Sequence, residues 1–317
     1  MTIGRPATVG PPTVVMLGLT AIYAVCFVAI KAGLPFAPPL LFAGLRALLG
    51  GLGLLSVMIV LRRPLLPSRG EWFGVVAVAL TATTISFGAM FLSPGLAGAG
   101  IASVLGNTQP LIVVVLAAIF LGERVTRGKA ITLALGLIGV GLIATPALAS
   151  SDAYGLSGAA LALGASGGLA VGSVIVKRMG THVDVLALTT WQLILGSLPL
   201  LGLSALIEGD TGVRWTFQFV GLLLFLALVG TSLASAVWYG LVQRGDVGRL
   251  SLFFFLIPVI GLGLAAVLFG ERVTPIEGAG VLLTLAGIGV LAWESRGSSP
   301  VSEAVPAAER GNDVASP

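Results

Sequence analysis

Long apolar runs separated by short polar turns fill the chain from residue 13 to residue 294. Each run is close to the ~20 residues that carry an α-helix across a ~30 Å hydrocarbon core. The pattern predicts ten membrane-spanning helices, over Thr13–Ile30, Pro39–Leu61, Trp72–Leu92, Gly98–Leu121, Ile131–Leu148, Leu156–Val176, Val183–Leu206, Phe217–Val242, Val247–Phe269 and Pro275–Trp293. Lys31, not a small-residue cleavage site, follows the first run, so we interpret that run as a span and not as a signal peptide.

The composition points to the same class of protein. Of the 317 residues, 56% are hydrophobic and 9% are charged, whereas a soluble domain carries roughly 25% charged residues. We therefore expect an all-α polytopic membrane protein in a lipid bilayer. The net charge of +4 is explained by basic loops, so nucleic-acid binding is not expected. Residues 1–12 and 296–317 form polar tails, and the second is expected to be disordered.

One stretch of the sequence occurs twice. Residues 110–126 read PLIVVVLAAIFLGERVT and residues 258–274 read PVIGLGLAAVLFGERVT. This register aligns Pro110 with Pro258 and aligns the two copies of the Gly-Glu-Arg turn with each other. The match predicts two repeats of five spans each, residues 13–149 and residues 150–295.

Lys and Arg are distributed unevenly between the two sides of the predicted bundle. With residues 1–12 in the cytoplasm, 13 of the 17 basic residues fall on the inner side. Cytoplasmic loops are enriched in Lys and Arg, so both termini are expected inside the cell. Five spans is an odd number, so the second repeat is expected to cross the membrane in the opposite sense to the first. Inverted repeats are typical of secondary transporters, whose substrate path lies between the halves.

The repeated unit resembles the EamA-type carriers of the drug/metabolite transporter superfamily. The resemblance rests on the Gly-Glu-Arg turn after a proline-containing fourth span, and on Ala29-Ile30-Lys31, Leu45-Arg46 and Trp191-Gln192. It covers residues 13–294. It implies a ten-helix carrier of the bacterial inner (plasma) membrane that exports amino acids or other small metabolites, with aromatic amino-acid exporters as the nearest functional type.

Acidic and histidine side chains are missing from the middle of the predicted spans. All 13 acidic residues lie at span ends, in loops or in the C-terminal tail, and the one histidine, His182, lies in a loop. A proton relay requires a titrating side chain inside the membrane, so we expect weak or no proton coupling. The same absence argues against a metal site with several histidine ligands. The lone Cys26 has no partner for an intramolecular disulfide.

A protease-like motif is interpreted as helix packing. Gly164-Ala165-Ser166-Gly167 reads G-x-S-G, as in intramembrane serine proteases, but a serine nucleophile needs a histidine on a neighbouring helix. Gly164, Gly168 and Gly172 are spaced four apart, as at close helix contacts. No glycine-rich phosphate loop is present either. We therefore expect no enzyme activity, no cofactor and no metal.

Arg46 is the one charged residue clearly inside a predicted span. It has two interpretations: it faces a cavity and holds a substrate carboxylate, or it reaches toward the interface and pairs with backbone. Pro110 and Pro258, near the centres of their spans, are predicted hinges because proline removes a helical hydrogen bond. The alternative is that membrane helices carry proline without bending motions.

Polar and aromatic residues near mid-span are candidates for substrate contacts or for hydrogen bonds between helices. The candidate cavity residues are Tyr23, Arg46, Thr84, Asn107, Gln109, Trp191, Gln192, Ser235, Trp238 and Tyr239. The aromatic group formed by Trp238, Tyr239 and Phe253–Phe255 is interpreted as shared between lipid, packing and the membrane interface. The two Gly-Glu-Arg turns are interpreted as interfacial caps.

The sequence therefore predicts a secondary transporter for small neutral or zwitterionic metabolites that works by alternating access. The alternative is a membrane sensor or assembly partner that transports nothing. A small-molecule substrate and the lipid bilayer are the expected partners, and a homodimer is possible. The sequence names neither the substrate nor the direction of transport.

Overall fold

The computed structural model describes residues 12–97, 105–145, 156–209, 212–269 and 273–297, and within these ranges the chain forms helices and turns without β-strands. The first repeat contains α1 (Pro12–Gly33), η1 (Leu34–Phe36), α2 (Pro39–Val60), α3 (Trp72–Val78), η2 (Ala79–Ile85), α4 (Ser86–Ala97), α6 (Gln109–Leu121) and α7 (Arg127–Ile143). The second contains α9 (Leu156–Met179), α10 (Val185–Ile207), α11 (Phe217–Ala227), η3 (Leu228–Leu233), α12 (Ala234–Arg244), α13 (Val247–Leu252), η4 (Phe253–Phe255), α14 (Leu256–Phe269) and α15 (Pro275–Gly297).

Eight helical segments of the described chain are long and apolar enough to cross a membrane. They correspond to the predicted spans one to three and six to ten, so the protein is an all-helical, multi-pass membrane protein. The predicted span Gly98–Leu121 lies partly outside the described residues, and its remainder is the 13-residue helix α6. The predicted span Ile131–Leu148 begins four residues earlier than expected, at Arg127, and its last residues lie outside the described chain.

Polar side chains fix where several helices begin. Thr126, Asp184, Thr216 and Asp246 each precede a helix and accept a hydrogen bond from a backbone amide of its first turn. Such caps satisfy amides that have no partner within the helix. The Thr126 cap explains why α7 starts before its first long apolar run.

The third span of each repeat contains a π-helical segment. In the first repeat η2 separates α3 from α4, and in the second η3 separates α11 from α12. The register that places Pro110 on Pro258 also places η2 on residues 227–233, where η3 lies. A π-helical turn widens the helix and frees carbonyl groups, and such turns are frequent at functional sites.

The fourth span of each repeat is broken just before its proline. A turn at Asn107–Thr108 precedes α6, and the 3₁₀ segment η4 precedes α14. Pro110 and Pro258 therefore lie in the first turn of a helical segment, where proline is readily accommodated, and not inside a continuous helix as the sequence suggested. The hinge role of both prolines stays a prediction.

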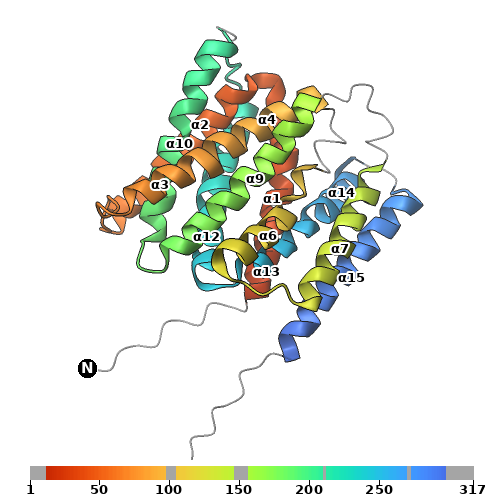
Figure 1. Ribbon diagram of the computed structural model, residues 1–317. Helices are drawn as coiled ribbons and strands as arrows, with labels where there is room; N and C mark the ends of the chain where they lie inside the picture. The colour runs from red at the N-terminus through yellow and green to blue at the C-terminus, as the bar shows by residue number, and fades with distance from the viewer. Residues whose placement is uncertain (1–11, 98–104, 146–155, 210–211, 270–272, 298–317) are drawn as a thin grey trace, which may run out of the picture.

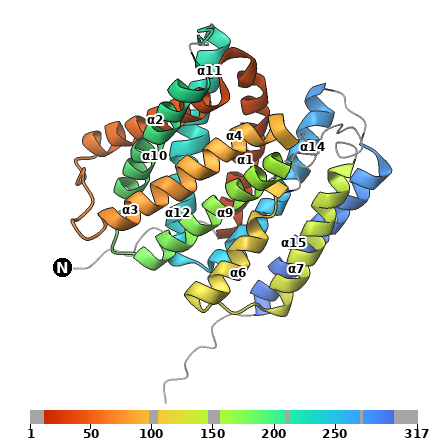
Figure 2. The same ribbon diagram turned by 45° about the horizontal axis from the view of Figure 1, so that its top comes forward.

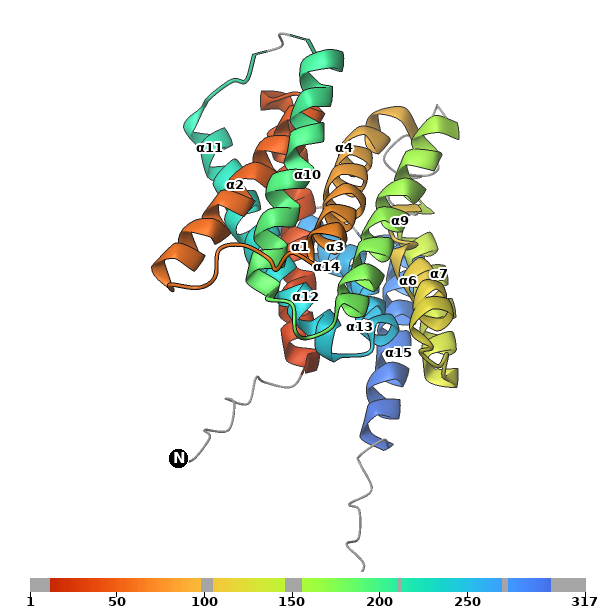
Figure 3. The same ribbon diagram turned by 60° about the vertical axis from the view of Figure 1, so that its left-hand side comes forward.

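The helices of one repeat pack mainly on those of the other. Helices α2 and α10 pack together (Figure 3), as do α7 and α15 (Figure 2). Helix α1 packs on α14, and in the matching contact α9 packs on α6. Helix α2 packs on α11 and η3, and in the matching contact α10 packs on α3 and η2. Each of these contacts therefore has a counterpart in which the two repeats exchange roles.

Two close crossings hold the centre of the bundle. The Ser232 hydroxyl of η3 donates to the Gly50 carbonyl of α2 at 2.6 Å, and the Thr84 hydroxyl of η2 donates to the Gly196 carbonyl of α10 at 2.8 Å. A Cβ atom at Gly50 would lie 2.9 Å from the Ala227 carbonyl oxygen. Glycine therefore permits an approach of the two backbones that a larger residue prevents.

The bundle has two distinguishable ends. Helix α1 begins and α15 ends at the bottom of Figure 1, which we call the terminal end, and the opposite side is the far end. Helix α1 leads away from the terminal end, whereas α9 leads toward it, as Figures 1 and 3 both show. The first helices of the two repeats therefore run in opposite directions.

We expect Gly50→Ala and Gly196→Ala each to lower the free energy of unfolding by about 1–3 kcal/mol, because the added methyl group clashes with a backbone carbonyl. Thermal or denaturant unfolding in detergent measures the effect. Gly221→Ala in α11 is the matched control, since its Cβ atom meets nothing within 4 Å. Equal stability of all three variants contradicts the tight crossing.

Candidate functional site

Arg46 of α2 is buried against η3 and α4. Only 3% of the residue is exposed. Its Nε donates to the Thr231 hydroxyl at 2.6 Å and its Nη2 to the Gly230 carbonyl at 3.3 Å, both in η3. The guanidinium also lies 4.9 Å from the centre of the Phe87 ring of α4. The side chain is therefore held inside the protein and does not extend to an interface.

One nitrogen of Arg46 lacks a hydrogen-bond partner among the described residues. Within the described part of the chain, Arg46 Nη1 is buried without a hydrogen-bond partner, and so is Nε2 of Gln109. The ion pairs of the described residues do not include Arg46. Both unpaired groups are hydrogen-bond donors.

Gln192 occupies the corresponding place in the other repeat. It lies on α10 four residues before Gly196, as Arg46 lies on α2 four residues before Gly50. The Thr83 hydroxyl of η2 donates to Gln192 Oε1 at 2.5 Å, and Thr83 is the counterpart of Thr231. The same crossing is thus built once with an arginine and once with a neutral amide.

A line of aromatic rings leads from α1 to α12. Tyr23 meets Phe254 edge to face with ring centres 5.6 Å apart, and Phe254 lies 4.7 Å from Trp238. The Trp238 indole donates to the Ser173 hydroxyl at 3.1 Å. Trp238, Tyr239 and Phe253–Phe255 are all at most 5% exposed. The interpretation that part of this group faces lipid is therefore wrong, because the aromatic rings fill the contact between the repeats.

The remaining predicted cavity residues lie in several surroundings. Thr84 takes part in the crossing at Gly196, Gln109 is the buried first residue of α6, and Asn107 is half-buried in the turn before it. Ser235 is half-buried on α12. The Trp191 indole donates to the Leu65 carbonyl at 2.7 Å and packs on Trp72. The structure thus brings Arg46, Tyr23, Thr84 and Gln192 into the central helix contacts and places Trp191 beside a loop.

A second polar cluster ties the two repeats together at the terminal end. Both carboxylate oxygens of Glu123 accept hydrogen bonds from the first amides of α13, Val247 N at 2.7 Å and Gly248 N at 2.9 Å. Lys129, 4% exposed, donates to Asp246 at 2.6 Å and lies 3.6 Å from Glu123. We call Glu123, Lys129, Asp246 and the start of α13 the terminal-end cluster.

The Gly-Glu-Arg turn explains how Glu123 reaches this position. Gly122 ends α6 in the left-handed conformation, with φ of 68°, which favours glycine. The chain reverses there and directs Glu123 to the start of α13. Glu123 thus caps a helix start, as expected of a cap, and its place at the membrane interface stays a prediction. Glu271 of the second copy lies outside the described residues.

The two carboxyl groups of the terminal-end cluster differ in acidity. Burial, together with a hydrogen bond to Asp246, raises the pKa of Glu123 above its usual range. Burial opposes ionisation of Asp246 as well, but hydrogen bonds from Glu123, Lys129 and the Arg249 amide outweigh it and lower the Asp246 pKa. Glu123 is therefore the first group of the pair to bind a proton when the pH falls, and Asp246 remains the anion that holds Lys129.

Sequence reasoning missed Lys129 and Asp246. An acidic residue directly before an apolar run is a usual helix-start signal, and Asp246 before Val247 fits it. Nothing in the sequence indicates that Glu123 and Lys129 of the other repeat meet this helix start. Among the described residues no group of three or more His, Cys, Asp or Glu side chains is placed to hold a metal ion.

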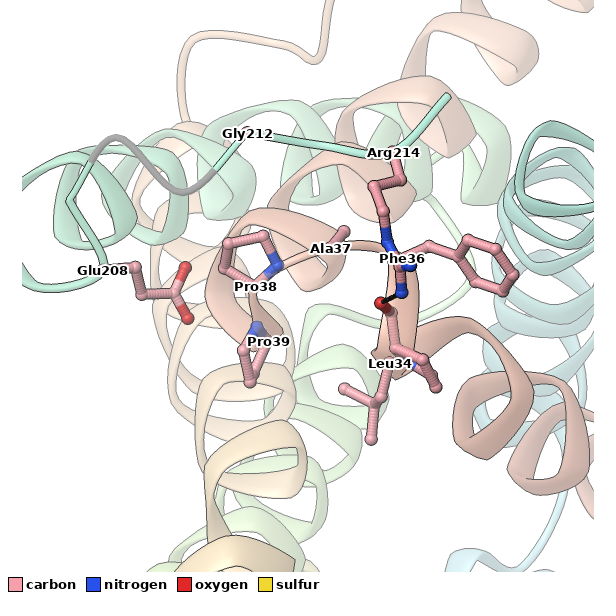
Figure 4. A pocket seen from close by; sticks show the side chains of 9 residues that line it. Leu34, Phe36, Ala37, Pro38, Pro39, Glu208, Gly212 and Arg214 are labelled. Atoms are coloured by element: carbon pink, nitrogen blue, oxygen red, sulfur yellow. Dashed lines mark hydrogen bonds between the residues drawn. The ribbon is translucent and has the colours of Figure 1, made fainter. Parts of the chain in front are cut away.

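A pocket of about 490 Å³ opens at the far end, beside the turn between α1 and α2. Its lining consists of Leu34–Pro39, Glu208, Gly212 and Arg214. The Glu208 carboxylate accepts from the Leu40 and Leu41 amides at 2.7 and 3.0 Å, and Arg214 donates to the Pro35 carbonyl (Figure 4). The charged groups of this pocket thus cap a helix and hold a turn.

Comparison with known proteins agrees with this arrangement. A model described as the EamA-like transporter family matches the chain twice, over residues 12–145 and 156–293. A Bacillus subtilis protein named "Uncharacterized transporter YvbV" is 32% identical over 84% of this chain and 86% of its own length. A Salmonella typhimurium protein named "Probable amino-acid metabolite efflux pump" is 32% identical over 90% of this chain and 96% of its own length.

A solved structure shares the fold. It has a TM-score of 0.78 and 18% identity, and the alignment covers 91% of this chain and 99% of that one. The family model spans nearly all of the helical chain, once for each repeat, and two relatives named as transporters align over most of their length. This protein is therefore a member of the EamA-like transporter family.

Proposed function

We propose that this protein is a secondary transporter that exports small neutral or zwitterionic metabolites, amino acids among them, across the bacterial inner membrane. Two related proteins, from Salmonella typhimurium and Escherichia coli, are named as amino-acid metabolite efflux pumps. The described core contains aromatic rings, hydroxyls and amides but no acidic side chain, which suits an uncharged or zwitterionic cargo.

The exchange of contacts between repeats is the observation that carries this proposal. The packing of α1 on α14 matches that of α9 on α6, and α1 and α9 run in opposite directions. This is the arrangement expected of two inverted five-span repeats. In such a protein, an inward-open conformation becomes an outward-open one when the two halves exchange conformations. Ten spans with cytoplasmic termini complete the proposed topology, which places the terminal end in the cytoplasm.

The terminal-end cluster then acts as the cytoplasmic gate. It joins the end of α6 in one repeat to the start of α13 in the other through two amide hydrogen bonds and an ion pair. In the proposed cycle α13 moves about the predicted hinge at Pro258, and opening of this side breaks those bonds. The proposed topology places the far-end pocket on the opposite side of the membrane.

Transport in proteoliposomes tests the proposed function. We expect counterflow of at least one radiolabelled amino acid from a panel of the twenty common ones, with little change when a pH gradient is imposed, because the described core lacks an acidic side chain. Empty liposomes and liposomes with heat-denatured protein are the controls. Absence of counterflow for the whole panel favours a sensor or assembly partner over a transporter.

We expect Lys129→Met to weaken closure of the terminal end, since the ion pair to Asp246 and the hydrogen bond to the Arg124 carbonyl are lost. Hydrogen bonds to charged groups contribute about 1.5–3 kcal/mol each. The measurement is labelling of Ser251→Cys by a membrane-impermeant maleimide, in a Cys26→Ala background; Ser251 of α13 is fully buried.

Labelling should be at least several-fold faster with Lys129→Met than without it. Arg127→Met is the matched control, because Arg127 is an exposed basic residue two positions away in the same helix turn. Equal labelling rates in all three backgrounds rule out a gate at the terminal-end cluster.

A further inference from the structure

We propose that Arg46 Nη1 binds the carboxylate of the transported molecule, so that the cargo is a carboxylate-bearing metabolite such as an amino acid and not an uncharged one. This proposal rests on the proposed transport function and specifies its substrate class. It also distinguishes between the two interpretations of Arg46 that the sequence left open.

The comparison of Arg46 with Gln192 is the first argument. The two residues occupy equivalent crossings, each four residues before a glycine whose carbonyl accepts a hydroxyl from a π-helical segment. Gln192 completes its crossing with one neutral hydrogen bond to Thr83. The packing of this crossing therefore requires a polar side chain but not a charge. The positive charge of Arg46 is an addition that the architecture does not explain.

The energetic situation of that charge is the second argument. A buried cation needs an anion or a full set of acceptors, and inside a membrane such residues mark substrate paths. Arg46 has two acceptors, Thr231 and Gly230, both neutral. The ionisable groups of α1 that interact electrostatically with it are Tyr23 and Cys26. Neither a phenol nor a thiol is ionised near neutral pH under ordinary conditions, so within the described residues the charge has no anionic partner.

The identity of the unpaired atoms is the third argument. Arg46 Nη1 can only donate a hydrogen bond, and the unpaired Nε2 of the Gln109 amide is likewise a donor. A ligand group that satisfies Nη1 must therefore be an acceptor, and an anionic acceptor also neutralises the guanidinium. Carboxylates fit guanidinium groups in a planar arrangement. A carboxylate accordingly supplies both the acceptor and the charge that Arg46 lacks.

The surroundings suit an amino acid with an apolar or aromatic side chain. Phe87 lies against the guanidinium, and Tyr23 leads from the neighbourhood of Arg46 to Phe254 and Trp238. Aromatic rings pack on apolar groups and tolerate a nearby ammonium group through cation–π attraction. A molecule held at Arg46 by its carboxylate thus meets aromatic surface with the rest of its structure.

The test compares amino acids with their amides, which keep the side chain and the ammonium but lose the carboxylate. Binding of radiolabelled L-phenylalanine, L-leucine and L-threonine to the purified protein is measured in competition with L-phenylalaninamide, L-leucinamide and L-threoninamide. In the wild type we expect the acid to bind about 10-fold more tightly than its amide, or better, since a charge-assisted contact is lost.

Arg46→Gln copies the residue that the equivalent crossing already contains, so its fold should be retained. We expect this variant to lose the preference for acid over amide, and to lose about 10-fold or more in affinity for the acid. Arg46→Lys keeps the charge and should keep part of the preference. Arg69→Gln, which removes an exposed arginine from the loop after α2, should behave as the wild type.

The outcomes separate this proposal from the transport function. A folded Arg46→Gln protein that still prefers acids overturns the proposal, and so does a wild type that binds acid and amide equally. If Arg46→Gln does not fold, a folded Arg46→Lys protein without any preference overturns it instead. If binding depends on Arg46 but no counterflow is found, the carboxylate site stands and the transport function is overturned. If counterflow is found without a preference for acids, the transport function stands and the carboxylate site is overturned.

Discussion

The close approach of α2 to η3, and of α10 to η2, is the contact on which the rest of the structure depends. Lipid offers no hydrogen-bond partners, so carbonyls freed by a π-helical turn and hydroxyls inside the bundle must find partners in the protein. Gly50 and Gly196 allow the backbones to come close enough for the hydroxyls of Ser232 and Thr84 to donate to their carbonyls. Each such bond contributes only about 0.6 kcal/mol on average. The crossings matter more for position than for stability, because they fix where Arg46 and Gln192 lie.

Much of the fold could be predicted from the sequence. The apolar runs were sufficient for the eight spans that the described chain contains, since a run of about 20 apolar residues has few alternatives to a transmembrane helix. The repeated Gly-Glu-Arg turn revealed the duplication. In its first copy Gly122 reverses the chain and Glu123 meets a helix start. The substrate role of the cavity candidates and the hinge role of the prolines stay predictions.

The finer features were not predictable for physical reasons. A π-helical turn differs from an α-helical one by a single shifted hydrogen bond, so it leaves no hydrophobic period to detect. The equivalence of Gly50 with Gly196 is hidden because the second spans are separated by two residues fewer than the fourth spans. Neighbours on a helix also point in different directions: Gln192 enters the bundle, while Trp191 next to it bonds to Leu65 in a loop. Sequence alone placed both in one cavity.

The duplicated architecture and the proposed carboxylate site impose opposite requirements. The proposed alternating access needs equivalent contacts in the two repeats, and the pairs of crossings and broken fourth spans provide them. An amino acid, however, has a negative end and a positive end, so a site with the same side chain from both repeats cannot recognise its direction. Placing the charge in one repeat and an amide in the other satisfies both requirements. Arg46 donates to Thr231, whereas Gln192 accepts from the equivalent Thr83, so both residues bridge equivalent elements but only one of them carries a charge. In the proposed site this difference in charge gives the cargo a direction, while the paired helix contacts stay equivalent in the two halves.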